Sequence, residues 1–150
     1  MQRREKSMKD IKEVYPDAIW KDEAGEEHFW NVSDYRPLLE SFGYKILLQV
    51  DDDGYQGDTR VLFKDGNRYG LLIFGWGSCS GCDALQACSS YEEIDELRQQ
   101  LHNDIKWGTA EELLEYIQGK DWELEWAWHE EETREFIQKA IEILQQEKIC

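Results

Sequence analysis

The 150 residues carry 33 acidic against 17 basic side chains, a net charge of −16 at pH 7, and 41% of them are hydrophobic. A chain with this net negative charge repels nucleic acid and anionic membranes, and it favours a protein partner with a basic surface. At this length we expect one domain over residues 1–150. No run of about 18 apolar residues could span a bilayer, so we expect the protein in the cytoplasm, where its cysteines stay reduced.

The chain opens with a basic segment. Residues 1–12 hold five basic and two acidic side chains, which indicates a lead-in that is mobile or helical. Ile11, Val14 and Tyr15 then follow at helical spacing and precede Pro16. Because proline ends a helix at the preceding residue, the spacing predicts a short helix that stops near Tyr15.

Two elements are expected before the main sheet. In residues 17–32, aromatic side chains flank the polar segment 22–27, a pattern that fits either a loose hairpin or an aromatic-anchored loop. A serine and an aspartate that can cap a helix precede Pro37, and Gly43 follows a short apolar stripe. These signals predict a helix over residues 34–42.

Three strands are expected next, at residues 44–50, 58–64 and 68–75. The turn after the first contains Asp51–Gly54, and the turn after the second contains Asp65–Gly66, a strong signal for a tight hairpin. Consecutive strands joined by short turns pair antiparallel. The sequence therefore predicts a three-stranded antiparallel meander.

After residue 88 the apolar period becomes helical, and three helices are expected at residues 90–103, 109–118 and 130–147. The first two start with capping-box patterns. Tryptophans alternate with acidic residues in 121–128, which predicts a half-buried strand or an extended segment held against the sheet. Strands followed by helices indicate an α+β fold, with the carboxy-terminal helices and the 34–42 helix covering the meander.

The helical half is also the most acidic part of the chain. Residues 91–135 contain fifteen acidic and four basic side chains. Glutamate-rich helix faces are often simply solvated, but such a surface can also dock on a basic groove of a partner, including one that normally holds nucleic acid. The positions that we name as a partner surface are Glu111, Glu112, Glu115, Glu123, Glu125, Glu130 and Glu131.

The segment 75–88 carries three of the four cysteines directly after an apolar strand. Cys79 and Cys82 are two residues apart, so their sulfurs could share a metal ion or form a local redox pair, with Cys88 nearby. A structural zinc site needs four ligands, and the second cysteine pair of such a site is missing. A fourth ligand would have to come from a position without persuasive spacing: His102, His129, Cys150 or Asp83. The spacing therefore permits zinc at this loop but does not favour it.

Other interpretations of the same loop stay open. Its small residues and free amides could cradle an anion, one cysteine could be a nucleophile with a base distant in sequence, or reduced cysteines could simply pack as small apolar groups. A thioredoxin-like redox pair is disfavoured, because the preceding strands lack the crossover helices of a parallel sheet. The ligand or metal candidates are Cys79, Cys82, Cys88, Ser78, Ser80, Asp83 and Asp58.

The turn after the first strand of the meander concentrates four aspartates: Asp51, Asp52, Asp53 and Asp58. Such oxygens could bind a hard cation, but the spacing of a calcium-binding EF-hand loop is absent. The sequence therefore favours a role in forming the turn.

Three motifs together, residues 55–58, 74–88 and 128–136, resemble a set of small phage, prophage and bacterial proteins. The resemblance extends from about Tyr44 to Ala140. It implies a phage-associated context in a bacterial cell and brings no activity with it. We therefore expect a small acidic binding protein that modulates or inhibits a host protein. The alternatives are a metal- or small-ligand-binding protein that uses the 75–88 loop and, less well supported, a cysteine-dependent enzyme; the sequence leaves the oligomeric state open.

Overall fold

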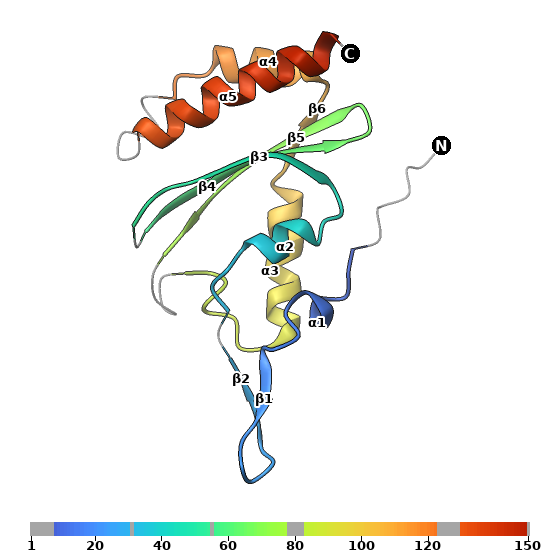
Figure 1. Ribbon diagram of the computed structural model, residues 1–150, viewed down its shortest axis with the longest axis vertical. Helices are drawn as coiled ribbons and strands as arrows, with labels where there is room; N and C mark the ends of the chain where they lie inside the picture. Colours follow the sequence, from blue (N-terminus) through green and yellow to red (C-terminus); the bar gives the residue numbers. More distant parts are fainter. Residues whose placement is uncertain (1–7, 31, 55, 78–82, 123–129, 150) are drawn as a thin grey trace. The chain divides into compact units, whose positions relative to one another are not determined.

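The computed structural model describes residues 8–30, 32–54, 56–77, 83–122 and 130–149 (Figure 1). It contains helices and antiparallel sheets, which confirms the α+β class. The chain divides into two compact units, which we call the hairpin unit (Met1–Tyr44 with Gly77–Asn103) and the sheet unit (Lys45–Trp76 with Asp104–Cys150). The expectation that residues 1–150 fold as one domain stays a prediction.

The sheet unit contains the meander that the sequence predicts. Its strands are β3 (Lys45–Asp51), β4 (Gly57–Asp65) and β5 (Arg68–Trp76), within two residues of the expected bounds. The turn between β4 and β5 uses Gly66 at a φ of 64°, a conformation that glycine adopts without strain. A fourth strand, β6 (Lys106–Gly108), pairs antiparallel with β5, so the strand order is β3-β4-β5-β6.

A glycine on β5 allows β6 to approach. A Cβ atom built at Gly70 would lie 2.6 Å from Ile105 Cγ2 and 2.9 Å from Trp107 Cζ3. These separations are too short for real atoms, so any larger residue at position 70 would push β6 away from β5.

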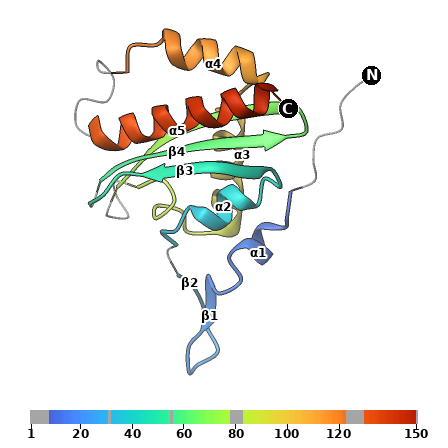
Figure 2. The ribbon, with the colours of Figure 1, turned by 45° about the horizontal axis from the view of Figure 1, so that its top comes forward.

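Helices α4 (Ala110–Gly119) and α5 (Glu130–Ile149) lie on the same face of this sheet in Figures 1 and 2. The Thr109–Glu112 capping box starts α4, with both of its hydrogen bonds at 3.1 Å. Apolar side chains from the sheet and both helices form one core: Val50, Leu62, Tyr69, Leu71, Ala110, Leu113, Leu114, Ile117, Phe136, Ala140 and Leu144. The expectation that the carboxy-terminal helices cover the meander is confirmed for these two.

A buried ion pair ties this unit together. Arg60 on β4 donates from Nη1 to Asp52 Oδ1 at 2.7 Å, and the two side chains are only 1% and 0% exposed. The second nitrogen, Nη2, donates to Thr133 Oγ1 in the first turn of α5 at 3.0 Å. Asp52 Oδ2 accepts from the backbone N–H of Asp58 at 2.7 Å. Asp52 is therefore a buried counter-ion as well as a turn residue, which the sequence did not reveal.

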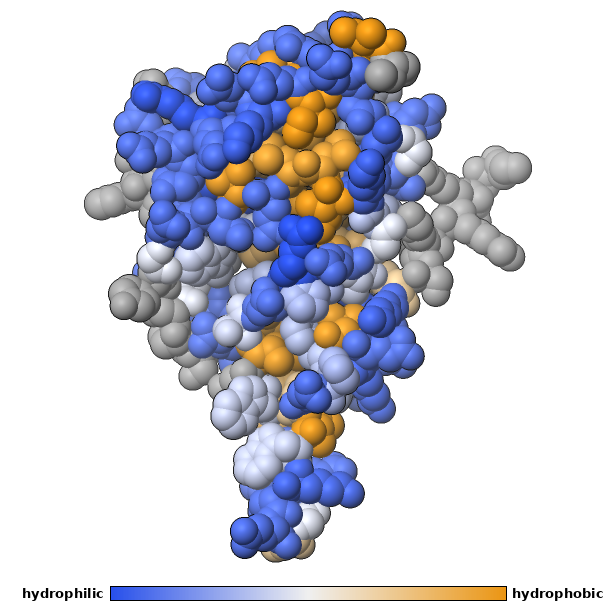
Figure 3. Space-filling view, in the orientation of Figure 1, coloured by the Kyte–Doolittle hydropathy of each residue, from blue (hydrophilic) through white to orange (hydrophobic). Residues whose placement is uncertain are grey.

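The carboxy-terminal end of α5 is fastened to the sheet by a second polar cluster. Glu147 Oε2 accepts from Lys64 Nζ at 2.7 Å and from the hydroxyl of Tyr69 at 2.6 Å. An apolar area remains visible between α5 and β3 (Figure 3). On these two elements, Leu47 and Ile137 are partly buried and pack against the core. The pairing of β3 with β4 has a register irregularity between Ile46 and Leu48.

The described part of the hairpin unit contains four short elements and one longer helix. These are α1 (Ile11–Val14), β1 (Ile19–Lys21), β2 (Glu27–Phe29), α2 (Arg36–Glu40) and α3 (Tyr91–Asn103). Of the two interpretations of residues 17–32, the structure has the hairpin, formed by β1 and β2. The 90–103 helix is confirmed as α3, and α2 is shorter than the expected 34–42. Because α2 and α3 belong to this unit, their expected place over the sheet stays a prediction.

The tryptophan-rich strand expected at residues 121–128 lies almost wholly outside the described residues. Asp121 and Trp122 are described, and neither is in a strand. Trp122 instead packs at the end of α4, where its indole donates to the carbonyl of Ile117 at 2.8 Å. None of the described helices has both the length and the apolar character needed to cross a membrane.

The buried pair generates a stability prediction. Arg60→Met leaves the Asp52 carboxylate buried without its counter-ion, so the free energy of unfolding should fall by about 3–5 kcal/mol. Arg36→Met, which removes an exposed i,i+4 pair with Glu40, should cost at most about 1 kcal/mol. Urea denaturation of both variants measures the difference. Equal, small losses would show that Arg60 does not stabilise the sheet unit.

Candidate interaction surface

The β1–β2 hairpin is closed by one aspartate. Asp22 Oδ1 accepts from the backbone N–H groups of Ala24, at 3.0 Å, and Glu26, at 2.9 Å. Gly25 takes a φ of 82°, which lets the chain reverse inside this turn. Strand pairing then places Ile19 opposite Phe29. A short polar sequence can hold this hairpin because the turn supplies its own hydrogen-bond acceptor.

Large apolar side chains are exposed on and beside the hairpin. Ile19 is 41% exposed, Trp20 43% and Trp30 63%. In the rest of the described chain, Ile149 is the other large hydrophobic residue with such exposure. Single exposed apolar residues are common, but three from one short segment mark a place where a partner can bind.

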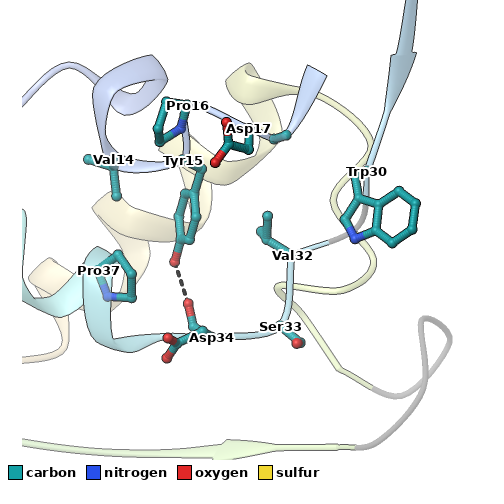
Figure 4. A pocket seen from close by; sticks show the side chains of 10 residues that line it. Val14, Tyr15, Pro16, Asp17, Trp30, Val32, Ser33, Asp34 and Pro37 are labelled. Carbon is teal, nitrogen blue, oxygen red and sulfur yellow. Dashed lines mark hydrogen bonds between the residues drawn. The ribbon is translucent and has the colours of Figure 1, made fainter. Parts of the chain in front are cut away.

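A pocket of about 380 Å³ lies beside Trp30 (Figure 4). Its lining residues are Val14, Tyr15, Pro16, Asp17, Ala18, Trp30, Val32, Ser33, Asp34 and Pro37. Figure 4 shows the Tyr15 ring running through the site to the backbone carbonyl of Asp34, to which its hydroxyl donates at 2.6 Å. The pocket is thus built from the end of α1, the residues that flank the β1–β2 hairpin and the segment that leads into α2.

The charge around this pocket is negative. Its lining includes the exposed residues Asp17 and Asp34. From Asp17 to Asp34 the sequence has six acidic residues and one lysine. An apolar wall next to carboxylates fits a lysine or arginine side chain, because the methylene stem can lie on the wall while the charge meets the carboxylates. The indole of Trp30 can add a cation–π contact.

Two buried tyrosines support the pocket and the adjoining segment. Burial, followed by the nearby Asp34 carboxylate, raises the pKa of Tyr15 well above its ordinary value. Burial likewise raises the pKa of Tyr35, whose hydroxyl donates to Asp83 Oδ1 at 3.0 Å and accepts from the backbone N–H of Leu85 at 3.2 Å. Both hydroxyls therefore stay protonated donors at neutral pH.

Asp83, one of the ligand candidates, is a buried hydrogen-bond hub. Besides the Tyr35 hydroxyl, its carboxylate accepts from the backbone N–H of Gly77, at 3.0 Å, and of Gln86, at 2.9 Å. Its side chain is 2% exposed. These bonds give Asp83 a structural role at the carboxyl side of the cysteine loop, and its role as a ligand stays a prediction.

The other loop candidates have separate outcomes. Ser78, Cys79, Ser80 and Cys82 lie outside the described residues, so their roles as ligand or metal candidates stay predictions. Cys88 is buried, and its Sγ donates to the carbonyl of Ala84 at 3.4 Å. Burial, together with nearby carboxylates, raises the pKa of this thiol, so Cys88 is not an activated nucleophile.

The remaining candidates lie in the sheet unit. Asp58 is on β4, paired in register with Gly75 on β5. Five of the seven named glutamates are exposed on α4 and α5: Glu111, Glu112, Glu115, Glu130 and Glu131. Glu123 and Glu125 lie outside the described residues. Neighbours balance part of this charge, since Glu111 meets Lys148 at 3.5 Å and Glu130 pairs with Arg134.

The hairpin surface was not among the sites expected from the sequence. The available signal was the group of tryptophans in an acidic segment without a clear apolar period. Large aromatic residues are usually buried, so the sequence favours a role as anchors over an exposed surface. No protein-family model, curated protein or solved structure matches the chain.

The protonated state of Tyr15 predicts an alkaline sensitivity. An unfolded tyrosine loses its proton near pH 10, whereas the folded pKa of Tyr15 is higher, so its contribution is complete below about pH 10 and is lost as the pH rises further. Urea denaturation between pH 8 and pH 11 should show a shallower loss of stability for Tyr15→Phe than for the wild type. Parallel curves would contradict a buried, neutral Tyr15.

The buried Cys88 predicts slow thiol chemistry. In a variant with Cys79, Cys82 and Cys150 changed to serine, iodoacetamide at pH 7.5 should alkylate the folded chain several-fold more slowly than the same chain unfolded in urea. The raised pKa and the burial of the sulfur both act in this direction. Equal rates in the two states would show that Cys88 is accessible.

Proposed function

We propose that this chain is a non-enzymatic binding protein that holds a basic segment of a partner protein on the surface formed by Ile19, Trp20, Trp30 and the adjoining pocket. The observation that carries the proposal is the pocket itself, in which an apolar wall and carboxylates lie next to an indole that is 63% exposed. An exposed tryptophan beside a pocket is a common anchor of protein interfaces.

The apolar part of the surface supplies the affinity. A tryptophan carries a large apolar area at a small cost in conformational entropy, and tryptophan is enriched among the residues that dominate binding energy. Pro16, Val32 and Pro37 surround the same pocket, and two of these are prolines with restricted backbones. Little ordering of the pocket is therefore needed when a partner side chain enters.

The charge supplies the selection of partner. Carboxylates at Asp17 and Asp34 favour lysine or arginine at the pocket, and the net charge of −16 attracts a basic surface from a distance. Because these charges are exposed, added salt should slow association more than it speeds dissociation. The exposed glutamates of α4 and α5 offer a further acidic surface for the same kind of partner.

The resemblance to small phage, prophage and bacterial proteins supports a biological setting for this proposal. In that setting the partner is a host protein with a basic groove, and binding modulates or inhibits it. An acidic protein can compete for such a groove with the nucleic acid that it normally holds.

A host-lysate capture followed by affinity measurement tests the function. The tagged chain should retain one basic protein in stoichiometric amount, and the purified pair should bind in isothermal titration calorimetry. Trp30→Ala should weaken the affinity by about thirtyfold, the effect of losing roughly 2 kcal/mol at an interface anchor. Ile149→Ala, which truncates an exposed hydrophobic side chain outside this surface, is the matched control and should bind like the wild type.

Two results would overturn the proposal. One is a captured partner whose affinity is the same for the wild type and Trp30→Ala. The other is an absence of any partner enriched over Trp30→Ala in the capture itself.

A further inference from the structure

We propose that Asp22, Glu26 and His28 on the β1–β2 hairpin form a binding site for a divalent transition-metal ion, for which Zn²⁺ is the probe. Ligand atoms of these three residues all lie within 4.8 Å of one another. In the described part of the chain, this is the one group of at least three histidine, cysteine or acidic residues that meets this criterion. The inference does not rest on the protein-binding function, because none of the three metal ligands belongs to the side chains that define that surface.

The donor set distinguishes this trio from a merely acidic cluster. Imidazole nitrogen and carboxylate oxygen are both zinc ligands, and a catalytic zinc site has three protein ligands with water or substrate in the remaining position. The exposed glutamates that begin α5, by contrast, offer carboxylate oxygens alone. Nitrogen and oxygen donors together favour a first-row transition metal over calcium or magnesium.

The hairpin brings the three residues together through strand geometry. Asp22 directly follows β1, Glu26 directly precedes β2, and His28 lies on β2. Side chains two residues apart on an extended chain point to the same face, so Glu26 and His28 share a face. Asp22 is next to them because strand pairing sets Lys21 opposite Glu27. The site therefore depends on the register of the hairpin.

Neighbouring groups already hold two of the ligands in position. Trp20 stacks on the His28 ring, with centroids 4.6 Å apart and planes 25° from parallel. The backbone N–H groups of Ala24 and Glu26 hold Asp22 Oδ1, while Oδ2 lies 2.8 Å from His28 Nε2. Ligands fixed by their neighbours lose less conformational freedom when an ion binds.

The ligand atoms of Asp22 and His28 are already in direct contact. The 2.8 Å contact between Asp22 Oδ2 and His28 Nε2 is a hydrogen bond. Metal–ligand distances of about 2.0–2.2 Å require the two atoms to be roughly 3.0–3.5 Å apart, so a small side-chain rotation admits the ion. Glu26, which is exposed, can turn toward the ion without disturbing packing.

Zinc titration of the full chain tests this site. After treatment with a chelator and a reductant, the wild type should bind Zn²⁺ in isothermal titration calorimetry at pH 7.5. His28→Gln, which keeps a donor toward Asp22 but removes the imidazole, and Glu26→Gln should each weaken this event about tenfold or more. Glu23→Gln is the matched control, because Glu23 is in the same turn but outside the trio.

A second readout assigns the ion to the site directly. In nitrogen-15 spectra of the histidine rings, Zn²⁺ should shift the His28 Nε2 resonance in the wild type and in Glu23→Gln. Circular dichroism of each variant checks that the fold is retained, and Glu26→Gln keeps the test decisive if His28→Gln unfolds.

Three outcomes would overturn the proposal. They are no zinc binding by the wild type at micromolar concentrations, equal affinity in the wild type, His28→Gln and Glu26→Gln, or binding that leaves the His28 resonances unmoved. Equal affinities, or unmoved His28 resonances, would assign the zinc to other ligands, of which the cysteines are the first candidates. None of these outcomes bears on the affinity of Trp30→Ala for a protein partner, so the two proposals fail separately.

Discussion

The buried charge of Arg60 is the constraint on which the sheet unit depends. A guanidinium that is 1% exposed is tolerable only with a counter-charge and hydrogen-bond acceptors in fixed places, and Asp52 and Thr133 provide them. These partners come from the β3–β4 turn and from α5. Satisfying one charge therefore fixes the turn, the register of two strands and the start of a helix together.

The β1–β2 hairpin, unlike the sheet unit, is held by local contacts and not by a buried charge. Its strands are three residues long, and its turn is closed locally by Asp22. A two-stranded ribbon of this size has no core of its own, so its side chains are not committed to packing. Binding surfaces are commonly found on such weakly packed elements, because a side chain that serves the core cannot also serve a partner. Trp30 and the trio of Asp22, Glu26 and His28 are side chains of this kind, which do not serve the core.

Most of the architecture could be predicted from the sequence, because it rests on local signals. The meander, α3, α4 and α5 follow from apolar periods, capping residues and an Asp-Gly turn, all of which act within a few residues. The ion pair of Asp52 with Arg60 could not be predicted, because it depends on strand register and on α5 lying over the sheet. The trio of Asp22, Glu26 and His28 likewise needs a hairpin register that the sequence left open between two interpretations. The cysteine loop was a candidate site because of the spacing of its cysteines alone. Spacing shows proximity in sequence but not orientation in space.

Among the residues that the structure describes, strand β3 has a neighbouring strand on one side only, and the apolar area next to α5 adjoins it. An edge of this kind can recruit a strand of another molecule and start aggregation. The irregular register at Leu47 interrupts the flat template that such recruitment needs, and Lys45 and Asp51 place charges at its two ends. With a net charge of −16 repelling like copies, the molecule has three independent protections against edge-to-edge polymerisation at high concentration.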